Sequence, residues 1–68
     1  MKIADVAFPV PLHRSFHYLV PADLGLAPGQ RVRAPFGPRG SLTGTVLSVF
    51  DGEPQRVLKT IEAARSKP

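Results

Sequence analysis

Hydrophobic residues along this chain occur in short runs, and within most runs apolar and polar positions alternate. Alternation with a period of two is the pattern of a β-strand that buries one face. The eight prolines and six glycines lie mostly between the runs, where they favour turns and end strands. The pattern therefore predicts several short strands joined by turns, with no helix longer than about two turns.

The segments that fit a strand are residues 2–8, 15–20, 31–36, 42–50 and 56–62. In the first, Ala4, Val6 and Phe8 share one face. In the second, Tyr18 points toward the core and His17 points to the opposite face. About five short strands in 68 residues favour an all-β fold, a small, partly closed β-barrel of the SH3-like or OB-like kind.

Two glycines and one segment carry further structural information. Pro28 and Gly29 predict a type II turn, in which the glycine has a positive φ. Gly44, inside the longest strand, indicates a bulge, a sharp coil or the close approach of another backbone. The last segment is ambiguous, because its apolar residues also fit helical spacing, so a short helix over residues 55–64 is the alternative to a strand.

The length of the chain suits one domain, which we place at residues 1–62, with 63–68 as a tail or linker toward a following domain. Nine Lys and Arg residues stand against five acids, and the formal net charge is +4. A basic balance of this kind favours a polyanion partner, most often nucleic acid. Solubility alone is the other explanation for a charge of this size.

Several classes of protein are disfavoured by what the sequence lacks. Without cysteine and with two histidines, the chain has no basis for a disulfide framework or a zinc site. No apolar run approaches the ~20 residues of a membrane span, and Asp5 interrupts the apolar N-terminal stretch, so we expect a cytoplasmic chain without a membrane partner. Nucleotide-binding and metalloprotease motifs are absent and the acids are scattered, so we expect no catalytic residue and no cofactor.

The stretch HRSFHY combines Arg14 with Phe16, Tyr18 and two histidines. Bases stack on aromatic rings and lie against guanidinium groups when a protein binds a single strand. The alternative is that Phe16 and Tyr18 are core residues of the second strand, which is the better interpretation of Tyr18.

A second basic stretch, RVRAPFGPRG, places Arg31 and Arg33 on one face of the third strand. Arg39 follows in a glycine-flanked turn, where Gly37 would let a ligand approach backbone N–H groups. Ordinary turn glycines and solvated arginines are the alternative interpretation. Lys59, on an apolar face of the last segment, either snorkels to solvent or marks the rim of a ligand site.

These stretches resemble the N-terminus of the PriA family, the primosomal replication-restart proteins also called primosomal protein N′. In that family the chain runs V-A-x-P-V-P-L-x-x-x-F-x-Y-x-x-P, which is matched here from Val6 to Pro21. A G-x-R-V-x-V-P-F-G segment is matched from Gly29 to Gly37, and a G-x-V strand from Gly44 to Val46. The resemblance covers roughly residues 3–62.

The resemblance implies a non-catalytic DNA-binding domain that recognises the 3′ end of the nascent leading strand at stalled forks or D-loops and serves primosome assembly in replication restart. Most members of the family are ATP-dependent 3′ to 5′ DNA helicases, whose motifs lie far downstream and are absent here. The pocket for the 3′-terminal nucleotide is implied to consist of Phe16, His17, Gly37 and Lys59. We assign contacts with the DNA backbone to Arg14, Arg31, Arg33 and Arg39.

His17 departs from the family, which usually has Asp at this position. A carboxylate only accepts hydrogen bonds, whereas an imidazole can also donate, so we expect different hydrogen bonds in this pocket. The alternative function is a protein-interaction barrel that docks onto the helicase core of the same chain or onto primosome proteins. A steep salt dependence would favour DNA as the partner.

Overall fold

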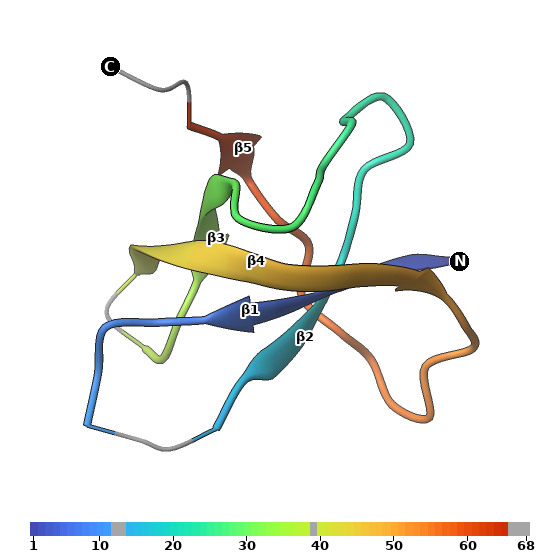
Figure 1. Ribbon diagram of the computed structural model, residues 1–68. Helices are drawn as coiled ribbons and strands as arrows, with labels where there is room; N and C mark the ends of the chain where they lie inside the picture. Colours follow the sequence, from blue (N-terminus) through green and yellow to red (C-terminus); the bar gives the residue numbers. More distant parts are fainter. Residues whose placement is uncertain (12–13, 39, 66–68) are drawn as a thin grey trace.

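The computed structural model describes residues 1–11, 14–38 and 40–65 (Figure 1). In this part of the chain the strands are β1 (Lys2–Ala7), β2 (Phe16–Leu19), β3 (Arg31–Pro35), β4 (Ser41–Asp51) and β5 (Ala63–Ala64). They form one antiparallel sheet in the order β2-β1-β4-β3-β5. The described residues contain no helix, and hence none long and apolar enough to span a membrane. The predicted all-β fold of about five strands is confirmed.

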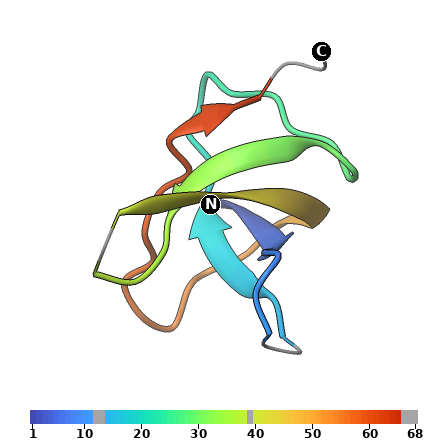
Figure 2. The same cartoon turned by 90° about the vertical axis from the view of Figure 1, so that its left-hand side faces the viewer.

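The long strand β4 connects the two halves of the sheet. Its first residues, 41–45, pair with β3, and its later residues, 45–51, pair with β1. Thr45 has a partner on both sides. The strand directions turn progressively across the sheet, as Figure 2 shows, in keeping with the twist that strand sterics impose. The coiled sheet encloses the core.

A β-bulge bends β4 where it passes β1. Asp5 pairs with Ser48, but the next pair is Val6 with Val46, so Leu47 has no partner in β1. The side chain of Leu47 is half exposed. An extra residue of this kind bends the strand and increases its local twist, which helps the sheet to coil.

Gly44 lies where β4 crosses the end of β1. A Cβ atom on Gly44 would lie 2.7 Å from Val6 Cγ1, 2.8 Å from the Ala7 carbonyl oxygen and 2.9 Å from Phe8 Cδ1. No side chain fits at these distances. Among the explanations that the sequence left open, the close approach of another backbone is the right one, and the bulge lies three residues further along β4.

The core is a single apolar cluster in which the strand alternation predicted from the sequence is confirmed. Ala4 and Val6 are fully buried, and Tyr18 is buried while His17 is exposed. The buried members of the cluster are Ala4, Val6, Phe8, Tyr18, Val32, Ala34, Val46 and Ile61. The turn before β3 also follows the prediction, because Gly29 has a φ of 91° and Gln30 N–H donates to the Ala27 carbonyl at 3.1 Å.

The predicted strand at 56–62 is wrong, and the alternative helix is wrong as well. After β4, the chain has to cross from the end of that strand to the far edge of the sheet, so residues 55–58 have no strand partner and Val57 is 97% exposed. The chain then meets β2: Leu19 N–H donates to the Lys59 carbonyl at 2.9 Å, and Ile61 N–H donates to the Leu19 carbonyl at 3.0 Å. We call residues 59–65 the closing segment.

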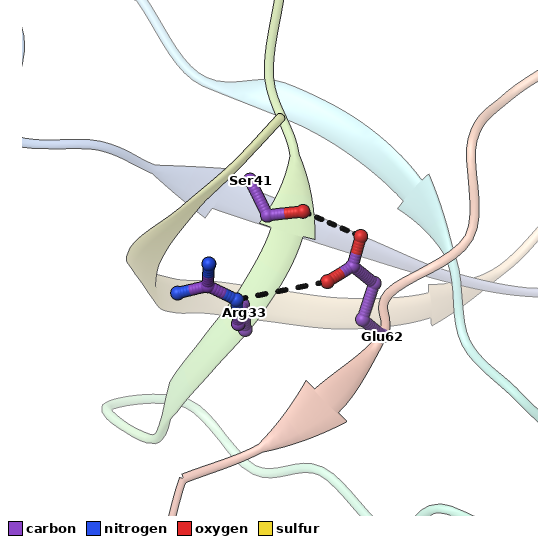
Figure 3. A network of polar contacts seen from close by, with 3 residues as sticks. All are labelled: Arg33, Ser41 and Glu62. Carbon is purple, nitrogen blue, oxygen red and sulfur yellow. Dashed lines mark hydrogen bonds and ion pairs between the residues drawn. The ribbon is translucent and has the colours of Figure 1, made fainter. Parts of the chain in front are cut away.

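The closing segment then continues along β3, at the other edge of the sheet. Glu62 N–H donates to the Arg33 carbonyl at 2.8 Å, and Arg65 N–H donates to the Arg31 carbonyl at 2.9 Å. The Glu62 carboxylate accepts a hydrogen bond from Ser41 Oγ and lies 3.8 Å from Arg33 Nε (Figure 3). Because this segment bonds to both β2 and β3, it links the two edges and makes the sheet a partly closed barrel.

The predicted tail, 63–68, thus begins as part of the sheet. Ala63 and Ala64 form β5, which pairs with Arg33 and Val32 of β3. Residues 66–68 lie outside the described residues. A linker beyond the closing segment stays a prediction.

Gly44→Ala is expected to destabilise the fold. The added methyl group meets the Ala7 carbonyl and two buried side chains, and overpacking of this kind costs about 1–3 kcal/mol. Gly25→Ala is the matched control, because no atom lies within 4 Å of its Cβ position and its φ is outside the left-handed region. Denaturant unfolding measures both, and the control should be unchanged or up to ~1 kcal/mol more stable. Equal stabilities for the two variants would contradict the close approach.

Candidate nucleic-acid interface

A pocket of about 550 Å³ opens beside the N-terminal half of β2. Three stretches that are distant in sequence line it, namely residues 14–18, 35–37 and 56–59. The fold therefore brings together all the residues that the resemblance assigned to a pocket, which are Phe16, His17, Gly37 and Lys59. Their roles toward a nucleotide stay a prediction.

Aromatic side chains form one wall of the pocket. The rings of Phe16 and Phe36 meet edge to face with centroids 5.2 Å apart, and Phe8 packs behind them, 4.7 Å from Phe36. Tyr18 donates its hydroxyl hydrogen to the Pro35 carbonyl at 2.6 Å, which ties β2 to the end of β3 across the pocket. Burial raises the pKa of Tyr18 above its ordinary value. This wall is rigid because each ring is held by its neighbours.

The main chain of His17 lies on an open edge of the sheet. Val20 N–H donates to the Lys2 carbonyl at 3.0 Å, and in an antiparallel pair every second residue bonds to the same neighbour. Leu19 and His17 therefore direct their N–H and C=O groups away from β1. Leu19 bonds to the closing segment, but the described residues provide no backbone partner for His17. One donor and one acceptor are thus left at the pocket.

The side chain of His17 faces the outer surface of the sheet. It lies opposite Asp5 of β1, with Nε2 3.6 Å from Asp5 Oδ1, and its ring contacts Phe50 with centroids 5.4 Å apart. Asp5 Oδ1 is buried and accepts no hydrogen bond within the described residues. The imidazole is therefore the neighbour of a carboxylate, and the different hydrogen bonds expected of His17 toward a nucleotide stay a prediction.

Gly37 and Lys59 line the pocket from two other segments of the chain. Gly37 has a φ of 69°, in the left-handed region, and no atom lies within 4 Å of its Cβ position. A hydrogen bond from Phe36 N–H to the Gly40 carbonyl, 2.8 Å long, closes the turn. Lys59 is exposed, and its carbonyl is held by Leu19 N–H, so the closing bond positions this cation beside β2.

The predicted DNA-backbone arginines lie in different places. Arg14 lines the pocket together with Arg56, which the sequence did not single out. Arg31 and Arg33 are exposed along β3 and do not line the pocket, and Arg33 is paired with a carboxylate of the closing segment. Arg39 lies outside the described residues. Backbone contacts by these arginines stay a prediction.

The charged side chains that line the pocket, among the described residues, are all basic. The lining contains the side chains of Arg14, Arg56 and Lys59 and, as far as the chain is described, no carboxylate. The described residues also include no group of three His, Asp or Glu side chains that could hold a metal ion. Cations, aromatic rings and free backbone groups suit a ligand with phosphates, flat bases and hydroxyl groups.

Comparison with known protein families matches residues 5–68 to the 3′ DNA-binding domain (3′BD) of PriA. The chain belongs to this family. The match includes all three stretches that line the pocket, and it confirms the resemblance on which the pocket was predicted. The family description makes this chain a DNA-binding domain rather than a catalytic one.

A curated relative supports the same assignment. The chain is 57% identical over 37 residues to the replication restart protein PriA of Haemophilus influenzae. This match covers 54% of the chain and 5% of the relative. The chain therefore corresponds to a small part of that protein.

Sequence reasoning missed several residues of this 3′BD pocket. Phe36 was present in the family pattern, but only its neighbour Gly37 was assigned to the site. Arg56 was missed because residues 56–62 were predicted to form a strand, whereas residues 56–59 lie outside the strands and line the pocket. The available signal was the presence of two cations, Arg56 and Lys59, within one short stretch.

Tyr18→Phe is expected to lower the free energy of unfolding at neutral pH by about 1 kcal/mol, because the hydrogen bond to Pro35 is lost. Burial raises the pKa of Tyr18 in the folded state. Its stabilising contribution is therefore present below its ordinary pKa of about 10 and is lost as the pH rises through the raised pKa. Urea unfolding at neutral pH and at several values around pH ~10 measures both effects. If the wild type and Tyr18→Phe lost the same free energy of unfolding as the pH rises, the result would contradict this role of the Tyr18 hydroxyl.

His17→Asp is expected to destabilise the domain by up to ~1 kcal/mol, because it places two carboxylates directly opposite each other. In the double variant Asp5→His/His17→Asp the carboxylate and the imidazole exchange places, so two carboxylates no longer face each other and most of the loss should be recovered. Thermal unfolding of both variants, beside His17→Asn as the uncharged control, measures the effect. A double variant no more stable than His17→Asp would contradict a contribution from this pair.

Proposed function

We propose that this chain captures the 3′ end of the nascent leading strand at stalled forks or D-loops and so serves replication restart. The observation that supports this most strongly is the meeting of Phe16, His17, Gly37 and Lys59 in one pocket of a 3′BD-family chain. The name of the Haemophilus influenzae relative, a replication restart protein, agrees with that role. We propose that binding needs no cofactor or metal ion.

The chemistry of a DNA 3′ end suits this pocket. A terminal nucleotide has a free hydroxyl group, which both donates and accepts hydrogen bonds, and it has no following phosphate. His17 offers one main-chain donor and one acceptor at the open edge of β2. We propose that these groups bind the 3′-hydroxyl.

The cations around the pocket suit the phosphates on the 5′ side of the same nucleotide. Lys59 and Arg56 lie on one flank of the pocket, where each can contact a single phosphate. Arg31 and Arg33 follow β3 and would contact DNA further from the end. Few contacts imply modest affinity, with a salt slope of roughly −2 to −3 for about three phosphates of a single strand.

A protein-docking function is the second candidate. Leu47 and Phe50 of β4 are 50% and 39% exposed, and large exposed apolar side chains favour contact with another protein surface. The helicase core of the same chain or primosome proteins would be the partners. A salt slope near zero together with binding to such a partner would favour this candidate over DNA.

Gly37→Asn is expected to abolish most of the preference for a free 3′-hydroxyl. Asn tolerates the left-handed backbone at this position, so the variant fills the pocket without breaking the turn. Fluorescence anisotropy compares one oligonucleotide with a 3′-hydroxyl and with a 3′-phosphate, and the ratio of the two Kd values should fall about tenfold toward one, as for the loss of one good contact. Gly29→Asn, at a positive-φ turn that does not line the pocket, is the control.

Two lysine variants test, in the same experiment, which cation contacts the DNA. Lys59→Gln should weaken binding to both oligonucleotides and make the salt slope less steep by about 0.7, while Lys2→Gln, an exposed lysine outside the pocket, should have a smaller effect. Wild type with equal affinity for both 3′ ends, unchanged by Gly37→Asn, would overturn the proposed recognition of the 3′ end.

A further inference from the structure

The guanidinium group of Arg14 lies over the ring of Phe16, with Cζ 4.6 Å from the ring centroid. Among the described residues this is the one cation placed over an aromatic ring. Arg14 is exposed and lines the pocket. A guanidinium group is attracted to the face of an aromatic ring, so the contact with Phe16 holds this planar group at the pocket.

Phe16 itself is held in place on its other sides. Its ring is packed against Phe36 at a centroid distance of 5.2 Å and an angle of 88°, and against Phe8 at 6.0 Å. The guanidinium therefore occupies the space that a base would need in order to stack directly on Phe16 from that side. Both residues line the pocket, and a nucleotide that approaches Phe16 from the side of Arg14 contacts the guanidinium group first.

Guanidinium groups are flat and weakly hydrated, and they stack on aromatic rings as well as under nucleobases. Arg56 lines the same pocket and remains available for a phosphate. We infer that Arg14 is the stacking platform for the terminal nucleobase, with Phe16 supporting the guanidinium from beneath, in place of the backbone contact expected for Arg14 from the sequence. This inference rests on the proposed function, because it names the group that contacts the base in that pocket.

The stacking role predicts a dependence on the base and not on charge alone. Arg14→Lys keeps the positive charge but loses the flat group, so it separates stacking from attraction to phosphate. Arg56→Lys is the matched control, since it makes the same change in the same pocket without an aromatic ring beneath it in the described structure. Circular dichroism and thermal unfolding check that both variants are folded.

The experiment measures Kd by fluorescence anisotropy for two single-stranded oligonucleotides that both end in a 3′-hydroxyl. One carries a normal terminal nucleotide, and the other carries an abasic terminal residue. Wild type should bind the normal end about five- to tenfold more tightly, as for one stacked base. Arg14→Lys should lose most of that ratio while keeping its preference for 3′-hydroxyl over 3′-phosphate and its salt slope. Arg56→Lys should keep the ratio.

Three results would overturn the inference. Arg14→Lys with an unchanged ratio, beside a Phe16→Leu variant that loses it, would mean that the base stacks on Phe16 directly. An equal loss for both oligonucleotides would mean that Arg14 contacts the backbone. Wild type without any preference for the normal end would mean that no base is stacked. Failure of the proposed function is a separate result, because it appears as equal affinity for 3′-hydroxyl and 3′-phosphate ends.

Discussion

The two hydrogen bonds between Leu19 and the closing segment hold this small barrel together. They join the edge strand β2 to a segment that continues along β3, so they connect the two ends of an otherwise open sheet. Ile61, which is 1% exposed, anchors the same segment in the core. The hydrogen bond from Tyr18 to the Pro35 carbonyl and the contact of Phe16 with Phe36 also join β2 to the end of β3, and such links matter in a small domain that buries little apolar surface.

The same closure also leaves the pocket beside β2 open, because it ends before the N-terminal half of that strand. Pairing with the closing segment ends at Leu19, so the next outward-facing residue of β2, His17, keeps a free backbone donor and acceptor. Tyr18, between them, holds the opposite wall through Pro35. The pocket therefore lies where the outer edge of β2 has no strand partner. Aromatic rings and cations line it. Among its hydrogen-bonding groups are the main-chain N–H and C=O of His17, which a change of the side chain at position 17 does not remove.

The sequence was informative where one physical rule dominated. Alternation identified β1 to β4 because each strand has one face in the core. Gly29 marked a turn with a positive φ, and Gly44 marked a close approach that leaves no room for a side chain. The last segment was mispredicted because its course depends on the distance between two sheet edges, which local pattern does not contain. The family resemblance supplied the pocket residues, but the pairing of His17 with Asp5 and the position of Arg14 over Phe16 depend on strand register and packing.

The order in which the walls of the pocket occur along the chain has a consequence for biosynthesis. One wall comes from β2, the next from the end of β3, and the last from residues that follow β4. Contacts between residues far apart in sequence form late, because a long loop must close first. A ribosome-bound chain that has exposed only β1 to β4 can already pair its strands, but it lacks Lys59 and the bonds that place it. The proposed capture of a DNA end therefore requires that the closing segment has emerged from the ribosome.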